Sequence, residues 1–244
     1  MLDDFIKENF KKRYVINLKH REDRYSEFKQ RSSLYFDPEL FEIFEGVYGK
    51  ELDSETLSEP YFQRPHTRIG EIGCHLSYRQ IWKNIAEDDE LNDDDLVIVF
   101  EDDVFFTEDF EKNFIEAVDS FNEENKLSNR FLYIGGRFSK NFRPSVKELD
   151  IFWNKTKSSD KLHKRNYSGS IPKNIIDRTT HVLIFSKYCA KIFLECSLSD
   201  DEKKPVPIDL FLFWCHGQNK GSIEYYDFFP HLCYSPIDYK TDIQ

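Results

Sequence analysis

Short apolar runs alternate with longer amphipathic stretches along most of the chain. The runs are rich in β-branched and aromatic residues, which predicts strands at 13–18, 40–47, 96–100, 130–134, 179–186 and 223–229. Between them, apolar residues recur every three or four positions, which predicts helices that end near residues 34, 86, 121, 198 and 215. Strands that alternate with helices are typical of an α/β fold, so we expect one such domain over residues 1–244. Residues 1–12 and 231–244 show neither pattern and are expected to be irregular.

The strand predicted at 96–100 runs directly into three consecutive carboxylates, Glu101, Asp102 and Asp103. Ligands of open α/β sheets bind outside the carboxyl ends of the strands. Three neighbouring carboxylates repel one another unless a cation neutralises them. Mg²⁺ or Mn²⁺, both of which take oxygen ligands, would remove that repulsion and could hold a diphosphate. An acidic surface turn after a strand explains the local pattern equally well.

Two arginines and one aspartate stand at other places where α/β proteins bind ligands. Arg21 and Arg24 follow the carboxyl end of the first strand, where guanidinium groups and a helix N-terminus would meet a phosphate. Two solvated arginines are the simpler interpretation. Asp209 follows Pro207 in the predicted first turn of the helix that ends near residue 215. The helix macrodipole favours an anion there, so the position alone does not require a catalytic role.

Composition narrows the functional classes. The net charge of -11 argues against general nucleic-acid binding, which needs a basic surface. No apolar run approaches the ~20 residues of a membrane span. The first residues lack the pattern of a signal peptide, so a cytoplasmic protein is expected. The five cysteines are widely scattered and lack the Cys-x-x-Cys spacing of a structural zinc site, which favours free thiols.

Residues 137–178 interrupt the alternation of strands and helices. They contain eleven Lys and Arg against four acidic residues, a net charge of +7 in a chain of net charge -11. A long basic loop inside a compact domain is often a lid or a binding loop. This one could cover a diphosphate or attract an anionic acceptor, and a solvated insertion is the equal alternative.

Five motifs occur in the same order as in a known family. They are Asn17-Leu18 with Arg21 and Arg24, Gly70-Glu71-Ile72-Gly73-Cys74-His75-Leu76-Ser77 with Trp82, Glu101-Asp102-Asp103, Thr180-His181-Val182 with Ser186, and Thr241-Asp242-Ile243-Gln244. Together they resemble glycosyltransferase family 25, which contains lipopolysaccharide galactosyltransferases and collagen galactosyl- and glucosyltransferases. Tyr78 departs from the resemblance, because the family usually has His at this place. The basic segment 137–178 has no matching motif.

The resemblance implies a GT-A type fold, with a Rossmann-like mixed sheet flanked by helices. It also implies an inverting glycosyltransferase that moves a hexose from a UDP-sugar, UDP-galactose or UDP-glucose, to a hydroxyl of a glycan or protein-linked acceptor. Mn²⁺ or Mg²⁺ at the Glu-Asp-Asp motif would bridge the donor diphosphate and stabilise the leaving group. A single displacement also needs a general base for the acceptor hydroxyl.

The resemblance also implies residue roles. Asp103 is expected to be a direct metal ligand, assisted by Glu101 and by Asp242 or His231. Asp209 is the expected general base. The nucleotide is expected to contact residues of the first three motifs, namely Asn17, Leu18, Arg21, Arg24, Ser77, Glu101 and Asp102. Of these, Glu101 or Asp102 would bind ribose or reach the metal through water.

Two alternative functions stay open. A metal-dependent phosphoryl or nucleotidyl transferase also places carboxylates at a strand end, but the chain has no Gly-rich phosphate loop. A sugar-binding protein that has kept the fold and lost turnover is the other alternative, because a fold does not by itself imply activity. Tyr78, in place of the usual His, points toward this second alternative.

Overall fold

A computed structural model of the chain describes residues 1–59, 61–63, 67–124, 129–137, 162–164, 177–178, 180–201, 203–228 and 231–235. Most of the basic segment 137–178 lies outside the described residues, and so does Asp242. The expected lid therefore stays a prediction.

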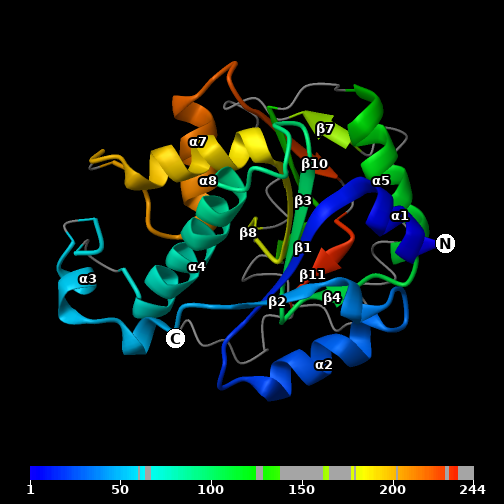
Figure 1. Ribbon diagram of the computed structural model, residues 1–244, viewed down its shortest axis with the longest axis horizontal. Helices are drawn as coiled ribbons and strands as arrows, with labels where there is room; N and C mark the ends of the chain where they lie inside the picture. The colour runs from blue at the N-terminus through cyan, green and yellow to red at the C-terminus, as the bar shows by residue number, and fades with distance from the viewer. Residues whose placement is uncertain are drawn as a thin grey trace.

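The centre of the fold is a seven-stranded sheet in the order β2-β1-β3-β9-β5-β10-β7 (Figure 1). Its strands are β1 (Phe10–Asn17), β2 (Glu42–Glu45), β3 (Leu96–Glu101), β5 (Arg130–Tyr133), β7 (Leu162–Lys164), β9 (Val182–Ser186) and β10 (Glu224–Phe228). β1 runs parallel to β2 and β3, and β5 runs parallel to β10. β9 is antiparallel to both of its neighbours, β3 and β5, and β7 is antiparallel to β10. The sheet is therefore mixed, as expected.

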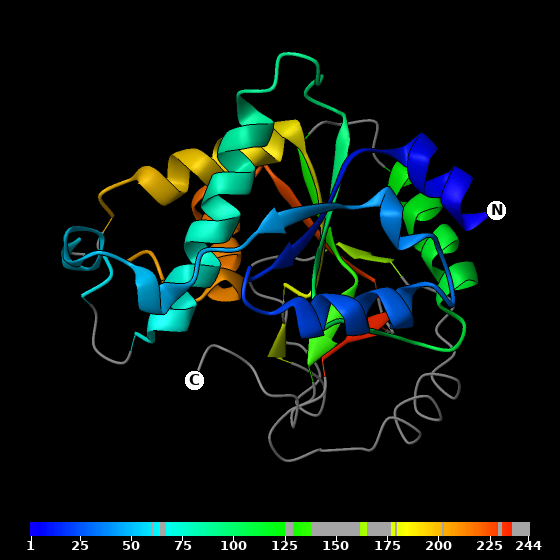
Figure 2. The same cartoon turned by 60° about the horizontal axis from the view of Figure 1, so that its bottom comes forward.

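Helices cover both faces of this sheet, and Figure 2 shows the two groups on opposite sides. One group is α1 (Leu2–Asn9), α2 (Glu22–Ser32) and α5 (Phe110–Glu124), and the other is α4 (Ile69–Ala86), α7 (Lys187–Leu198) and α8 (Ile208–Gln218). Short helical turns in the connections are η1 (Pro38–Leu40), η2 (Gly49–Glu51) and α3 (Ser54–Ser58). The predicted α/β class with flanking helices is confirmed. None of the described helices is long and apolar enough to cross a membrane.

Strand β3, which lies inside the sheet, is buried on both faces, and this explains its continuous apolar run. Leu96, Ile98 and Phe100 face the core beneath α1, α2 and α5. Val97 and Val99 face the core beneath α4, α7 and α8. A strand covered on both sides needs apolar residues at every position, so its sequence does not alternate.

A second sheet consists of short strands in the order β4-β11-β6-β8. Its first strand, β4, comes just after the acidic turn in the sequence. Its strands are β4 (Phe105–Phe106), β6 (Gly135–Arg137), β8 (Asp177–Arg178) and β11 (Cys233–Tyr234). β11 falls in a segment that the sequence predicts to be irregular, so that prediction is wrong at 233–234. Strands of two or three residues are too short to show a period of two in the sequence.

The N-terminus also differs from the sequence prediction. Residues 2–9 form α1 and β1 already begins at Phe10, although irregular structure is predicted for 1–12. Leu2 and Ile6 lie one turn apart on α1 and are both buried in the core. So short a helix is marginal without tertiary packing, and two buried positions are too few to predict it.

Candidate active site

The acidic turn meets the end of the first strand because β1 and β3 are parallel. Ile16 lies opposite Glu101 in the register of the two strands, so the residues that follow them are neighbours. The backbone N–H of Asp102 donates to the carbonyl of Ile16 at 3.2 Å. Nδ2 of Asn17 donates to Oδ2 of Asp102 at 2.7 Å, and both side chains are buried. Two motifs that are distant in the sequence thus form one site.

The helix α2 supplies positive charge to this turn. Nη2 of the buried Arg24 lies 2.5 Å from Oδ1 of Asp102 and 3.3 Å from Oδ2 of Asp103. Two turns later, Arg31 donates from Nη2 to the carbonyl of Asp102 at 2.7 Å and from Nε to the carbonyl of Val104 at 2.9 Å. One face of α2 therefore compensates the carboxylates and fixes the backbone of the turn.

The antiparallel strand β9 brings two further residues to the same place. β9 begins beside the end of β3, and the N–H of Glu101 donates to the carbonyl of His181 at 2.9 Å. Nδ1 of His181 lies 3.1 Å from Oε2 of Glu101 and 3.2 Å from Oδ1 of Asp103. Thr180 donates from Oγ1 to Oε1 of Glu101 at 2.5 Å. Glu101 is thus held from two sides.

Thr180 and His181 belong to one of the sequence motifs, yet the sequence alone assigns them no role. The apolar pattern of a strand does not show whether the strand runs parallel or antiparallel to its neighbours. If β9 ran parallel to β3, it would begin at the other end of the strands, away from the acidic turn. The sequence does contain one indication that these two residues belong to the site. A polar Thr-His pair directly before a buried strand needs hydrogen-bond partners, and the acidic turn provides them.

Burial and like charge determine how these groups ionise. Burial raises the pKa of Asp102 to about 7; Arg24 opposes the rise, whereas Asp103 and Glu101 add to it. Burial alone would lower the pKa of His181, but the attraction of Asp103 and Glu101 outweighs it and raises the pKa to about 9. The site therefore attracts positive charge, which a proton or a metal cation can supply.

Glu101, Asp103 and His181 fit a metal ion. One ligand atom from each of them lies within 4.8 Å of the other two. The two carboxylates suit Mg²⁺ or Mn²⁺, and an imidazole suits transition metals such as zinc and iron. Nε2 of His181 is buried and has no hydrogen-bond partner in the part of the chain that the structure describes. Asp102 is not a member of this group; its Oδ2 accepts from Asn17 and its Oδ1 pairs with the guanidinium of Arg24.

Of the two residues expected to complete the metal shell, His231 is buried but is not a member of this cluster. Asp242 lies outside the described residues. Ser235, just after β11, donates from Oγ to Oδ2 of Asp103 at 3.3 Å. The chain segment that leads toward Asp242 thus reaches the cluster, and the role of Asp242 stays a prediction.

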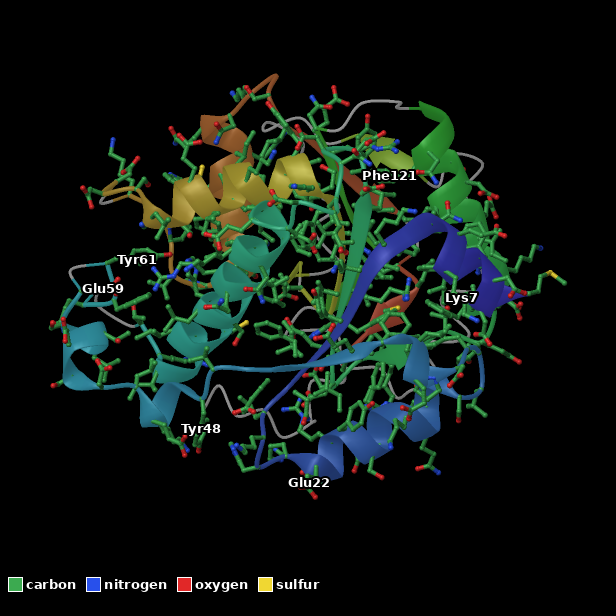
Figure 3. The ribbon with its side chains drawn as sticks, in the orientation of Figure 1. Lys7, Glu22, Tyr48, Glu59, Tyr61 and Phe121 are labelled. Atoms are coloured by element: carbon green, nitrogen blue, oxygen red, sulfur yellow. The ribbon has the colours of Figure 1, made fainter. Side chains whose placement is uncertain are left out.

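A cavity of about 90 Å³ that opens to solvent adjoins the acidic turn. Tyr48, labelled in Figure 3, lies in its wall near the start of α4, and its ring centroid is 4.3 Å from that of His20. The complete lining is Ile16, Leu18, Arg24, Val47, Tyr48, Gly49, Gly70, Cys74, Ser77, Glu101, Asp102 and Asp103.

Two glycines allow the two backbone segments that form one wall of this cavity to pack closely together. A Cβ atom at Gly49 would collide with the carbonyl of Ile69, and a Cβ atom at Gly73 would lie 2.5 Å from the carbonyl oxygen of Val47. The segment after β2 therefore packs directly on the backbone of α4, where only glycine fits. Ser77 fastens the same contact, because its Oγ accepts from the N–H of Val47 and donates to the carbonyl of Gly73, both at 2.8 Å.

Arg21 and Asp209 take different places relative to the cavity. Arg21 pairs with Asp23 through hydrogen bonds of 2.9 and 3.0 Å near the surface. Asp209 is half-buried in the first turn of α8, as predicted. Burial first, and then the charges of Glu101 and Asp209, raise the pKa of the Cys74 thiol. Asp209 therefore lies within electrostatic reach of the cavity wall to which Cys74 belongs.

Tyr78 occupies the place where the resembled family usually has His, and its hydroxyl reaches the cluster. The side chain is fully buried on α4. Its hydroxyl lies 2.7 Å from the carbonyl oxygen of Thr180 and 3.2 Å from Oε1 of Glu101. The departure from the family pattern therefore contacts a candidate metal ligand.

Comparison with known proteins identifies the family. The profile of glycosyltransferase family 25 (LPS biosynthesis protein) matches residues 10–212. The chain belongs to glycosyltransferase family 25. The matched part of this family 25 chain contains Asn17, Arg24, the acidic turn, His181 and Asp209.

Several relatives of this family 25 chain are similar in sequence to it. Procollagen galactosyltransferase 2 of Homo sapiens is 35% identical over 153 residues, which are 58% of this chain and 22% of that protein. Procollagen galactosyltransferase 1-A of Xenopus laevis is 36% identical over 140 residues, 53% of this chain and 22% of that protein. The procollagen lysyl hydroxylase and glycosyltransferase of Acanthamoeba polyphaga mimivirus is 26% identical over 225 residues, 86% of this chain and 22% of that protein. The chain thus spans less than a quarter of the length of each of these relatives.

Proposed function

We propose that the chain is an inverting hexosyltransferase that moves galactose or glucose from a UDP-sugar to a hydroxyl of a glycan or protein-linked acceptor. The observation that carries the proposal is the cluster of Glu101, Asp103 and His181 beside a cavity that opens to solvent. Substrate phosphates commonly bind proteins through divalent cations that carboxylates hold. Membership of family 25 supports the reaction class, and the names of the relatives make galactose the first sugar to test.

In this proposal Glu101, Asp103 and His181 hold Mn²⁺ or Mg²⁺. The cation, when bound, would supply Lewis-acid stabilisation to the leaving diphosphate. Asp102 supports these ligands from beside them, since it binds Asn17 and Arg24 next to the acidic turn. The nucleotide would lie along the cavity wall that Leu18 and Ser77 line.

A donor screen in the presence of Mn²⁺ tests this function. The full chain should turn over UDP-galactose or UDP-glucose, and Asp103→Asn should lower that turnover at least ~100-fold because a metal ligand is lost. Asp119→Asn is the matched control, because Asp119 is exposed on α5 and should leave turnover unchanged. Full activity of Asp103→Asn would remove the metal assignment. Mn²⁺ binding by a chain that turns over no UDP-sugar would favour the inactive sugar-binding alternative.

Asp209 is proposed as the general base for the acceptor hydroxyl. It is half-buried at the start of α8 and acts electrostatically on the same cavity wall as Glu101. Asp209→Asn should retain UDP-sugar binding, measured by calorimetry, and lose sugar transfer by about 10²–10⁴-fold, as is usual for a general base. Transfer at the wild-type rate would assign the proton transfer to another group.

A further inference from the structure

The hydroxyl of Tyr78 makes one more polar contact than a buried hydroxyl needs. The phenol has one proton, which it donates to the carbonyl oxygen of Thr180 at 2.7 Å and shares with a second acceptor in a three-centre hydrogen bond. The additional contact of 3.2 Å is with Oε1 of Glu101, a candidate metal ligand. The hydroxyl of Tyr78 therefore touches Glu101 and also the residue that donates to Glu101.

The two oxygens of Glu101 have different surroundings as a result. Oε1 accepts from the hydroxyl of Thr180 at 2.5 Å and lies beside the hydroxyl of Tyr78. Oε2 lies 3.1 Å from Nδ1 of His181, and the same nitrogen lies 3.2 Å from Oδ1 of Asp103. The carboxylate cannot rotate without losing its contacts with two hydroxyls, so Oε2 stays directed toward the other two members of the cluster.

We propose that Tyr78 is a positioning residue that, together with Thr180, fixes Glu101 so that Oε2 faces the divalent cation. The inference rests on the proposed function, because it takes Glu101 as a metal ligand. The inference predicts that a substitution of Tyr78 changes the affinity for the metal. A buried tyrosine with a purely structural role would affect only the stability of the protein.

Titration of the full chain with Mn²⁺ in a calorimeter, without donor, tests the inference. Tyr78→Phe removes one oxygen atom and keeps the ring that packs near Trp82. The dissociation constant for Mn²⁺ should rise about 10-fold or more, as for other residues that orient metal ligands. In turnover assays the apparent KM for Mn²⁺ should rise by a similar factor, while kcat at saturating Mn²⁺ changes little.

Tyr226→Phe is the matched control. Tyr226 is also buried, and its hydroxyl donates to Oε2 of Glu224 at 2.8 Å, but it lies on β10, three strands away from β3. This variant should lose a similar amount of thermal stability and keep the wild-type affinity for Mn²⁺. If Tyr78→Phe does not fold, Thr180→Val removes the other hydroxyl on Oε1 and should weaken Mn²⁺ binding in the same way.

The outcomes separate the inference from the proposed function. Equal Mn²⁺ affinity in wild-type protein and Tyr78→Phe, with UDP-sugar turnover intact, would overturn the inference and leave the function standing. Wild-type protein that binds no Mn²⁺ and gains nothing from it in turnover would overturn both the inference and the metal assignment.

Discussion

His75 is a histidine that the fold keeps neutral. Its ring is fully buried, Nδ1 lies 3.1 Å from the carbonyl oxygen of Val206, and the ring centroid of Phe211 is 4.8 Å away. Burial first, and then the positive charge of Arg79, with a smaller effect from Lys204, lower the pKa of His75 to about 3. The carbonyl that His75 contacts belongs to the segment that leads directly into α8. A neutral imidazole therefore helps to fasten this segment to α4.

The low pKa of His75 predicts a loss of stability in mild acid. The unfolded chain binds a proton at His75 below the ordinary pKa of 6.5, and the folded chain does so only near 3. Stability is therefore present above pH 6.5 and is lost as the pH falls, by about 2 kcal/mol at pH 5. His75→Gln should remove that part of the pH dependence, measured by urea unfolding at pH 7 and pH 5.

The exposed His20 provides the control for this experiment. His20→Gln should leave the difference in unfolding free energy between pH 7 and pH 5 as it is in the wild type. An equal pH dependence in His75→Gln and the wild type would show that His75 is not the group responsible.

At the scale of elements, the contact between α4 and the segment after β2 depends on the missing side chain at Gly73. An alanine in the interior of a helix is normally more favourable than glycine by about 1 kcal/mol. Here the new Cβ atom would lie 2.5 Å from the carbonyl oxygen of Val47, so Gly73→Ala should instead destabilise the protein by about 1–3 kcal/mol.

Urea unfolding gives the sign of this change directly. The variant should also bind the proposed UDP-sugar donor more weakly, because Val47 and Tyr48 line the cavity and would have to move. A Gly73→Ala protein that is more stable than the wild type would contradict the close approach of the two segments.

The elements that build the site differ in how far the sequence predicts them. β1 and β3 each end in polar residues and each precede a helix, so a common edge for Asn17, Arg24 and the acidic turn follows from parallel pairing. His181 could not be placed in this way, because its position depends on the direction of β9, which the apolar pattern leaves open. Tyr78 could be recognised as a departure from the family, but its contact with Glu101 follows only from the packing of α4 on the sheet.

At the scale of the whole molecule, the site joins segments from across the chain. Asn17 comes from β1, Glu101 from β3, His181 from the start of β9, and Ser235 from the end of β11. The central strand β9 forms backbone hydrogen bonds to β3 and β5, so the same strand completes both the sheet and the acidic cluster. Any change that loosens β9 should therefore affect both stability and the proposed metal binding.

The late position of β9 also has a consequence for synthesis on the ribosome. A nascent chain that has reached the end of α5 already carries the three acidic residues and Arg24. It still lacks His181 and β9, which is the second neighbour of β3. The edge of β3 from Leu96 to Phe100 is then unpaired and apolar, which makes it a template for aggregation until β9 arrives. Pairing over such a separation in sequence is slow, so the acidic cluster with His181 should be among the last parts of the molecule to form.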